Sequence, residues 1–344
     1  MSLNRMVIAA AAAAAMTAFL WGCKPKTTAV TVAAPVTGTV RVCYIPKNTG
    51  NPYFDAVNNG FTQASSALHF KYTEQAPATA DATDQIPIIQ QQVQDGVNVI
   101  AISPNSPEAL DPAIRAAEQH GVRVITIDAD LTGSEQLRSA CVLPTDFNKL
   151  GASQIELIGS LMGYTGDFAI LSATTDAPNQ NAWIAGMKVA LKLPKYAGMH
   201  LVEIAYGNDD PQKSLLEAQS LMTKYPHLKG ILSPTTVGIA AAAQAVETGG
   251  AAGKVQVTGL GTPNQMRRFV LDGTVKKFAL WDPAQMGYTA GYLAYGLARG
   301  TIHPAAGVSF TAGTEGIRVF GTNNVISNGP LMVFNKSNIG QYHF

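Results

Sequence analysis

The chain has 344 residues, of which 47% are hydrophobic and 14% charged, and its formal net charge is +1. A chain of this length can bury a large core and is expected to divide into two domains. It contains no basic run and no acidic block, which argues against a surface that follows the phosphates of nucleic acid. We therefore expect an α/β protein without a nucleic-acid partner.

The N-terminus has the pattern of an export signal. Arg5 precedes a 15-residue apolar stretch, residues 6–20, which is too short for a comfortable membrane span and typical of a secretion signal. The stretch ends in "LWGC", which resembles the lipobox of bacterial lipoproteins, where the Cys is lipidated and becomes the new N-terminus. We therefore expect a signal peptide at residues 1–22, lipid on Cys23 and a lipid-anchored linker at residues 23–38. An ordinary signal peptide with an incidental Cys is the alternative.

The first half of the remaining chain alternates apolar strands with amphipathic helices. Strands are predicted at residues 40–45, 97–102, 122–127 and 140–143, with helices starting near positions 54, 84 and 107. Cys43 and Cys141 lie inside the first and last of these strands, so we expect two buried free thiols too far apart to pair. Export would permit a disulfide, which stays open as an alternative.

The second half repeats the same rhythm. Strands are predicted at residues 167–172, 200–205, 229–232, 254–258 and 275–280, and helices at 147–162, 181–192, 211–224, 236–247, 263–272 and 284–298. Continuous apolar strands between amphipathic helices imply parallel sheets that are covered on both faces. Two such sets predict an α/β protein with two similar doubly wound lobes, whose ligand binds at the carboxyl ends of the strands.

The lobe boundaries follow from where the rhythm restarts. The N-terminal lobe is predicted to comprise residues 39–144 plus 282–309, and the C-terminal lobe residues 145–281 plus 310–344. The hinge strands joining the lobes are expected near residues 143–145, 280–283 and 308–311.

No catalytic or metal-binding motif is recognisable. The six histidines are isolated in sequence, and neither a Gly-x-Ser-x-Gly elbow nor a Cys-x-x-Cys pair occurs. Gly259 and Gly261 follow a strand, but the third glycine of the dinucleotide fingerprint is missing, so a tight turn explains them better. The sequence therefore predicts neither an enzyme nor a cofactor or metal site.

Polar and aromatic residues instead recur where the predicted strands end. Each hydroxyl of a sugar both donates and accepts hydrogen bonds, and the CH faces of the sugar ring stack on aromatic rings. The pattern therefore predicts a sugar site in the cleft between the lobes. The candidates are Lys47, Asn51, Tyr53, Phe54, Asp128, Asp130, Asn179, Gln180, Trp183, Pro234, Thr235, Thr236, Trp281 and Asp282.

Several of these candidates also have a structural interpretation. Asp128 could cap a turn, Asn51 could start one before Pro52, and Trp183 could belong to the core. Their common position at the strand ends favours binding for most of them. Asp209 and Asp210 directly precede a predicted helix and are expected to cap it.

These residues and several longer motifs resemble the periplasmic solute-binding proteins that feed monosaccharides to ABC importers. "NPYF" after the first strand fits that family. The motifs "IPK" at 45–47, "YPHLKGILSP" at 225–234, "GTPNQMRRFVLDGTVKKFALWD" at 261–282 and "FNKSNIGQYHF" at 334–344 resemble its branch that binds autoinducer 2 and rhamnose. The likeness covers nearly all of residues 40–344.

By this resemblance, Lys47, Asp128, Gln180 and Pro234 fall on ligand-contacting positions, and Trp183 and Trp281 on the cleft aromatics. Two positions differ from the autoinducer-2 binders. They have Asp-Gln where this chain has Asn179-Gln180, and Pro-Asp-Ala where this chain has Pro234-Thr235-Thr236. The ribose-type pattern also fails, because its Asp-Arg is Asp128-Ala129 here.

The resemblance implies a monomeric, lipid-anchored binding protein at the periplasm or cell surface. Its two lobes would close on one small neutral sugar, rhamnose-like or another monosaccharide, and present the closed form to a membrane permease. Lys47 is expected to offer donors to the ligand and to pair with Asp128. Uptake of autoinducer 2 and sugar sensing through a membrane receptor are the alternatives.

Overall fold

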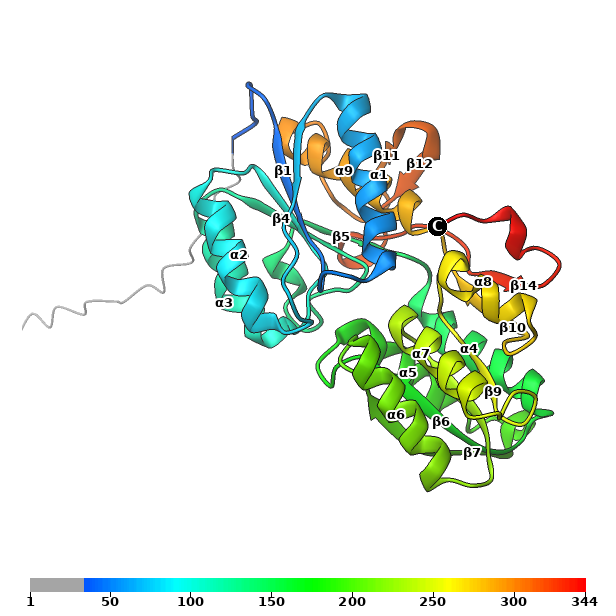
Figure 1. Cartoon of the computed structure of the whole chain (residues 1–344). Coiled ribbons are helices and arrows are strands. Elements are labelled where there is room, and N and C mark those ends of the chain that lie inside the picture. Colours follow the sequence, from blue (N-terminus) through cyan, green and yellow to red (C-terminus); the bar gives the residue numbers. More distant parts are fainter. Residues whose placement is uncertain (1–33) are drawn as a thin grey trace, which may run out of the picture. The chain divides into compact units, whose positions relative to one another are not determined.

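Two parallel β-sheets organise residues 34–344, the part of the chain that the computed structural model describes (Figure 1). The first sheet has the strand order β13-β5-β4-β3-β1-β2, and every neighbouring pair is parallel. Its strands are β1 (Arg41–Ile45), β2 (Lys71–Glu74), β3 (Val99–Ile102), β4 (Arg123–Ile127), β5 (Ala140–Leu143) and β13 (Val325–Ser327).

Helices cover both faces of the first sheet because its central strands are apolar on both sides. In β1, Val42 and Tyr44 join one core cluster, whereas Cys43 and Ile45 join the other. Helices α1 (Pro52–Leu68) and α9 (Pro283–Arg299) cover the first of these cores, and α2 (Ala82–Gln94) and α3 (Pro107–Gln119) the second.

Helices α1 and α9 approach each other unusually closely. A Cβ added at Gly60 would lie 2.0 Å from the carbonyl oxygen of Ala284, and one added at Gly287 would lie 2.0 Å from that of Val57. Only glycine permits this contact of backbones. The middle of α1 is thereby held against the first turns of α9.

The second sheet has the order β7-β6-β8-β9 and is also parallel. Beyond β9, an isolated bridge between Leu260 and Ala279 leads to β10, which pairs with β14 in antiparallel fashion. The strands are β6 (Thr165–Ser172), β7 (Gly198–Tyr206), β8 (Leu228–Ser233), β9 (Gln256–Gly259), β10 (Lys277–Leu280) and β14 (Met332–Asn335). The helices are α4 (Phe147–Met162), α5 (Pro178–Ala190), α6 (Pro211–Lys224), α7 (Thr236–Thr248) and α8 (Pro263–Leu271).

The remaining elements are short. β11 (Ser309–Thr311) and β12 (Ile317–Val319) form an antiparallel hairpin, and single 3-10 turns occur at Glu135–Leu137, Pro194–Tyr196, Gly313–Glu315, Thr322–Asn324 and Ile339–Gln341. The expected α/β architecture with two parallel-sheet lobes is confirmed.

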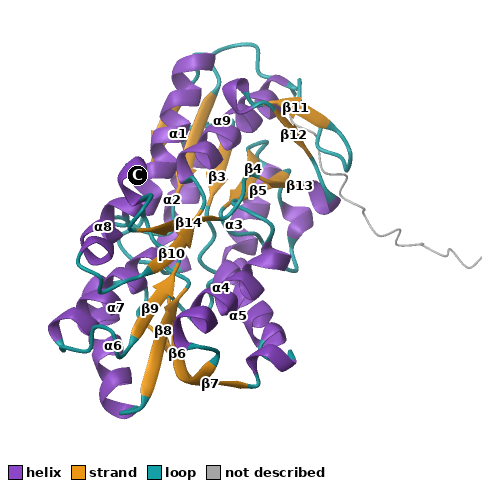
Figure 2. Ribbon diagram, turned by 90° about the vertical axis from the view of Figure 1, so that its right-hand side faces the viewer, coloured by secondary structure: helices purple, strands orange, loops and turns teal. Residues whose placement is uncertain are grey.

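The chain passes between the two sheets three times, and one of the expected crossings was wrong. Residues 144–146 and 281–282 join the sheets where predicted. The third crossing is not at 308–311, which enter the β11–β12 hairpin, but at 328–331, because β13 pairs with β5 before β14 pairs with β10 (Figure 2). The assignment of 310–344 to the second lobe was therefore wrong as far as residue 327.

We accordingly call residues 34–143 and 283–327 the first lobe, and residues 147–280 and 332–344 the second lobe. Cys43 and Cys141 are buried free thiols, as predicted, and β3 and β4 separate their strands. The predicted signal peptide and Cys23 lie outside the described residues, as does most of the predicted linker at 23–38. No helix within 34–344 is long and apolar enough to cross a membrane.

Asp130, expected at the cleft, is instead held in a largely buried ion pair with Arg138 of the first lobe. The Arg138 guanidinium donates to both Asp130 oxygens, at 2.7 Å and 2.6 Å, and to the carbonyl oxygen of Asn323 at 2.7 Å. The Arg138 side chain is 1% exposed and that of Asp130 15%. This contact ties the segment before β13 to the rest of the first lobe.

Arg138→Ala is expected to lower the free energy of unfolding by about 3–5 kcal/mol, because it leaves the Asp130 carboxylate buried without its partner. Urea unfolding followed by circular dichroism measures this change. The control is Lys149→Ala, whose ion pair with Asp146 is exposed (side chains 83% and 40%) and contributes less than about 1 kcal/mol. Equal effects of the two variants would contradict the prediction.

Candidate ligand-binding site

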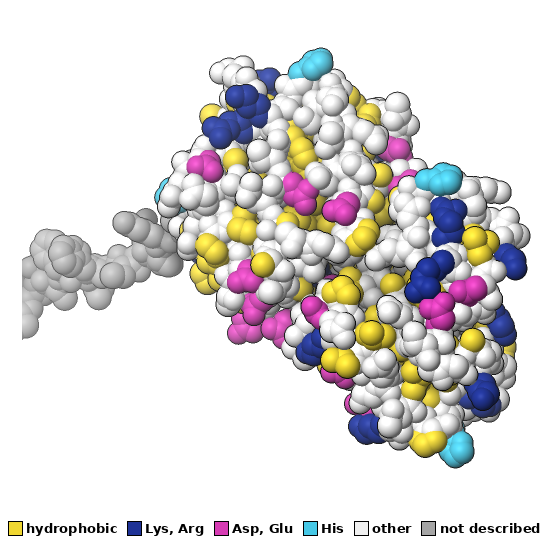
Figure 3. Space-filling model, in the orientation of Figure 1, with side chains coloured by type: hydrophobic (Ala, Val, Ile, Leu, Met, Phe, Trp, Pro, Cys, Tyr) yellow, Lys and Arg dark blue, Asp and Glu magenta, His cyan; other side chains and the backbone are white. Residues whose placement is uncertain are grey.

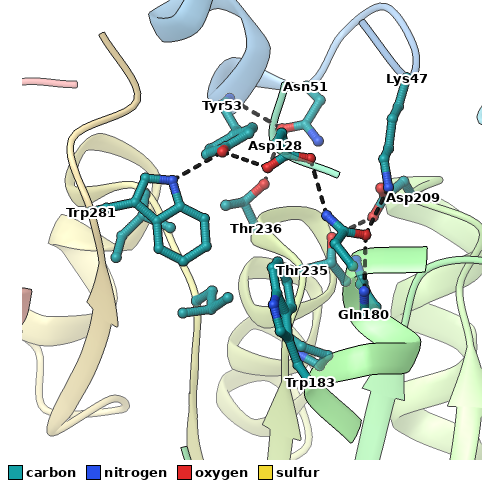
Figure 4. A pocket seen from close by; sticks show the side chains of 14 residues that line it. Lys47, Asn51, Tyr53, Asp128, Gln180, Trp183, Asp209, Thr235, Thr236 and Trp281 are labelled. Carbon is teal, nitrogen blue, oxygen red and sulfur yellow. Dashed lines mark hydrogen bonds between the residues drawn. The ribbon is translucent and has the colours of Figure 1, made fainter. Parts of the chain in front are cut away.

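A cavity lies between the carboxyl ends of the two sets of strands, where the two lobes face each other (Figure 4). The empty space between its lining atoms, counting space that is open to solvent, is about 340 Å³. Its lining comes from both lobes and one crossing segment: Lys47, Asn51, Tyr53, Asp128, Asn179, Gln180, Trp183, Asp209, Pro234, Thr235, Thr236, Leu260, Leu280 and Trp281.

The turn after β1 supplies three of these residues. Asn51 caps α1, because its side-chain oxygen accepts a hydrogen bond from the backbone N–H of Tyr53 at 3.1 Å. Pro52 occupies the first turn of the helix, where its missing N–H costs nothing. Lys47 lies earlier on the same turn and is 3% exposed. The cap therefore fixes Tyr53 next to Asn51, and all three residues line the cavity.

Asp128 follows β4 with a φ of 69°, a left-handed conformation that Asp tolerates better than most residues. Three hydroxyl or amide donors surround its carboxylate: the Tyr53 hydroxyl at 2.6 Å, the Ser103 hydroxyl at 3.0 Å and the Asn179 amide at 3.0 Å. Burial raises the pKa of this carboxyl group, against the opposing effects of Lys47 and of the Tyr53 and Ser103 bonds.

The expected pairing of Lys47 with Asp128 was wrong, because Asn179 lies between them. The Lys47 ammonium donates to the Asn179 side-chain oxygen at 2.8 Å, and the Asn179 amide donates in turn to Asp128. Burial lowers the pKa of Lys47, while Asp128 and Asp209 act to raise it. Asn179 is therefore the residue of the second lobe that links the two charged groups of the first.

The second lobe presents further polar groups from the first turns of α5 and α7. The Gln180 oxygen accepts from the Ser172 hydroxyl at 2.7 Å and the Ala173 backbone N–H at 2.9 Å, which orients its amide. The Thr236 hydroxyl donates to the Asn51 oxygen at 3.0 Å. Together with the two bonds of Asn179, this contact joins the lobes across the cavity.

Three aromatic rings contribute to the apolar part of the wall, together with Pro234, Leu260 and Leu280. The Trp281 indole lies edge-on to Tyr53, with ring centroids 6.1 Å apart, and to Trp183 at 5.8 Å. The Trp281 N–H donates to the Tyr53 hydroxyl at 2.9 Å, whose own proton goes to Asp128. The rings are thus held in place by packing and by hydrogen bonds.

Besides Asp130, two expected site residues lie outside the cavity. Phe54 is buried in the core of the first lobe, packed edge-on against Tyr53 with centroids 5.1 Å apart. Asp282 caps α9 by accepting from the backbone N–H groups of Ala284 and Gln285, at 2.9 Å and 3.3 Å. The other eleven expected residues line the cavity.

The sequence reasoning missed Asp209, Leu260 and Leu280 as lining residues, and it misread Asp209 as a helix cap. Asp210 alone caps α6, accepting from the Lys213 backbone N–H at 2.6 Å. The available signal was the position of Asp209 just after β7, at the same sheet edge as the other candidates. Thr235, which was expected at the site, binds Asp209 through its hydroxyl.

The chemistry of this lining suits a polyhydroxyl ligand. None of the fourteen lining residues is a Cys, His or Ser, and residues 34–344 contain no cluster of His, Cys, Asp and Glu that could hold a metal ion. The lining instead combines donors, acceptors and ring faces, which match hydroxyl groups and the CH faces of a sugar ring.

The periplasmic binding protein domain model matches residues 42–302, which is most of the chain and includes all the lining residues. The chain belongs to the periplasmic binding protein family. The general resemblance inferred from the sequence is thereby confirmed.

Sugar-binding members of this family are similar over most of the chain. A sugar ABC transporter protein from Actinomyces odontolyticus is 40% identical, covers 89% of this chain and 100% of its own, and has a TM-score of 0.70. An ABC transporter solute-binding protein from Clostridium phytofermentas, solved with L-rhamnose, is 33% identical, covers 89% and 99%, and has a TM-score of 0.85. The D-ribose/D-allose-binding protein of Pseudomonas aeruginosa is 26% identical over 68% of this chain and 75% of its own.

Membership defines the general role of this periplasmic binding protein. The family consists of substrate-binding proteins rather than enzymes, and its members bind sugars and work with ABC transporter permeases. It also implies a periplasmic or extracellular location.

Acidic and basic side chains are scattered over the face in Figure 3 without gathering into one continuous basic patch.

Proposed function

We propose that this protein captures one small neutral sugar, rhamnose-like or another monosaccharide, in the cavity between its lobes and delivers it to an ABC importer. The observation that carries the proposal is the cavity itself, in which polar groups from both lobes and three aromatic rings converge. The similar solute-binding protein from Clostridium phytofermentas, solved with L-rhamnose, supports the choice of sugar.

The geometry supports capture by closure of the lobes. Direct hydrogen bonds such as Lys47–Asn179 and Thr236–Asn51 exist only while the lobes are together, and a sugar between them adds further contacts to both sides. Hydrogen bonds to charged groups contribute about 1.5–3 kcal/mol each. Micromolar binding needs only about 8 kcal/mol, so a few such bonds and one stacked ring suffice. Closure about the three crossing segments is the hinge motion expected for such proteins.

A thermal-shift screen tests this function. A ligand that binds only the folded state stabilises it in proportion to the logarithm of ligand concentration over Kd. We expect L-rhamnose, or another monosaccharide in a panel of deoxyhexoses, pentoses and polyols, to raise the melting temperature. The matched control is Lys47→Met, which should show a smaller shift at the same sugar concentration. The absence of any shift across the panel would refute the proposed function.

Binding of autoinducer 2 is the second candidate. It is favoured by the LsrB protein from Clostridium saccharobutylicum, solved with AI-2, which is 25% identical, covers 89% of this chain and 100% of its own, and has a TM-score of 0.84. Including this signal in the same panel distinguishes the two ligands by the size of the shift.

We further propose that the mature protein is a monomer anchored to the membrane by lipid on Cys23. The proposal rests on an apolar stretch that ends directly at a Cys followed by a Thr-, Ala- and Pro-containing segment. Mass spectrometry of the purified mature protein should find a lipid-modified N-terminal Cys23, and Cys23→Ser should release the protein from membranes. An unmodified N-terminus generated at another position would contradict the prediction.

A further inference from the structure

Asp209 is a buried carboxylate in the cavity wall whose role is not explained by the fold. It lies on the loop between β7 and α6, is 6% exposed and follows Asn208 in a left-handed turn, with φ values of 57° and 52°. The carboxylate lies near the Lys47 ammonium (Figure 4), in the cavity wall that also includes Asn179. Its neighbour Asp210 caps α6, so the helix does not need Asp209 as a cap.

The hydrogen bonding of Asp209 is incomplete. One oxygen accepts from the Thr235 hydroxyl, and no donor among residues 34–344 reaches the other. Asp128, across the cavity, receives three donors on its two oxygens. A buried carboxylate with a single donor leaves much of its hydrogen-bonding capacity unused, which is costly unless a ligand or water completes it.

The charges around Asp209 disfavour a purely structural role. The Lys47 ammonium interacts electrostatically with the carboxylates of both Asp209 and Asp128. Among the residues that line the cavity, two carboxylates therefore share one ammonium group. Burial raises the pKa of Asp209; the Thr235 bond and Lys47 oppose that effect, and Asp128 adds to it. Hydrogen bonds from ligand hydroxyls would stabilise the ionised form.

The second lobe also offers a donor that has no partner. The Trp183 indole N–H is buried and bonds to no acceptor within residues 34–344, although the residue lines the cavity. The free acceptor on Asp209 fits a ligand that carries hydroxyl groups, because a hydroxyl can donate a hydrogen bond to it.

We propose that Asp209 is a ligand-contacting, specificity-determining residue whose free carboxylate oxygen accepts a hydrogen bond from one particular sugar hydroxyl, with Thr235 positioning the carboxylate. The proposal rests on the proposed function and deepens it. The ligand class is a monosaccharide with a free hydroxyl at the ring position that faces the β7–α6 loop. Sugars lacking that hydroxyl bind more weakly because the carboxylate is then left without its second donor.

Calorimetry tests the contact with L-rhamnose, or the sugar with the largest thermal shift, and its monodeoxy analogues. Asp209→Asn keeps the shape and tolerates the left-handed backbone, but it should weaken binding of the parent sugar at least tenfold. Asp210→Asn, the adjacent control, preserves a good helix cap and should bind within twofold of the wild type.

A cycle of variants and analogues identifies direct contact. The wild type should bind one monodeoxy analogue at least tenfold more weakly than the parent sugar. For Asp209→Asn, the affinities for these two sugars should differ less than threefold, since the contact is already absent there. Thr235→Val should also reduce the difference between the affinities for the parent sugar and for the analogue. If Asp209→Asn does not fold, Thr235→Val takes its place in the cycle. Tight sugar binding with no such coupling at any hydroxyl would overturn the inference while leaving the proposed function intact. Failure of the wild type to bind any sugar would refute the proposed function itself.

Discussion

Asp128→Asn is expected to weaken sugar binding by a hundredfold or more. The amide removes one of two acceptor oxygens and turns an NH₂ group toward the hydroxyl and amide donors that surround this side chain. Each buried donor that loses its acceptor costs about 1–3 kcal/mol, and every 1.4 kcal/mol is a factor of ten in affinity. Asn tolerates the left-handed backbone at this position, so the fold should survive.

The control for this substitution is Asp282→Asn. Asp282 is adjacent to Trp281 of the cavity, but its carboxylate only caps α9, a task that Asn performs equally well. Calorimetry should show unchanged affinity for Asp282→Asn and a loss of a hundredfold for Asp128→Asn. An affinity within threefold of the wild type for Asp128→Asn would mean that the ligand binds elsewhere.

Most of the site could be predicted from the sequence because parallel strands all end at the same edge of a sheet. Lys47, Asp128 and Pro234 each lie one or two positions after the end of a strand and converge in the cavity, where Gln180, from the helix that follows β6, joins them. The strands themselves are recognisable as apolar runs between helices. This rule needs no knowledge of side-chain direction, which is why it succeeds from a single sequence.

The wrong site predictions concern residues for which the direction of the side chain decides whether they line the cavity. Tyr53 and Phe54 are adjacent on α1, and neighbouring helix residues point about 100° apart, so one ring faces the cavity and the other the core. Asp209 and Asp210 both precede a proline that starts a helix, and only the geometry shows which one is the cap.

Five strands were not predicted (β2, β11, β12, β13 and β14), and β2 and β13 illustrate why. β2 is an edge strand whose residues, Lys71–Glu74, are all partly or fully exposed, so it has no apolar run to recognise. β13 is three residues long, and its place beside β5 depends on the whole chain path. Neither strand supplies a residue to the cavity, so the binding hypothesis did not depend on them.

Asn179 has a central position in the site because it contacts both charged residues of the first lobe. Its oxygen accepts from Lys47 and its amide donates to Asp128, so an amide matches a cation on one side and an anion on the other. A carboxylate here would keep the first contact and lose the second. The difference from the autoinducer-2 binders at this position should therefore change both closure and ligand preference.

Asn179→Asp alone is expected to weaken binding of the wild-type sugar at least tenfold at neutral pH. The new carboxylate would lie about 3 Å from Asp128, and like charges at that distance raise one of the two pKa values. The two lobes of this variant then close more easily when either Asp128 or the new carboxyl group is protonated. Its affinity for the sugar should therefore rise as the pH is lowered. The wild type has an amide at this position and should lack that additional rise.

The double variant Asn179→Asp with Thr236→Ala should shift the preference toward autoinducer 2. Removing the Thr236 hydroxyl breaks its bond to Asn51 and opens space on the facing wall, while the new carboxylate supplies an acceptor that the wild type lacks. Calorimetry with L-rhamnose and autoinducer 2 should find that the ratio of their affinities changes at least tenfold between the wild type and the double variant. A wild type that already binds autoinducer 2 at micromolar affinity and ignores rhamnose-like sugars would contradict the argument, because it would show that these two positions do not determine the ligand.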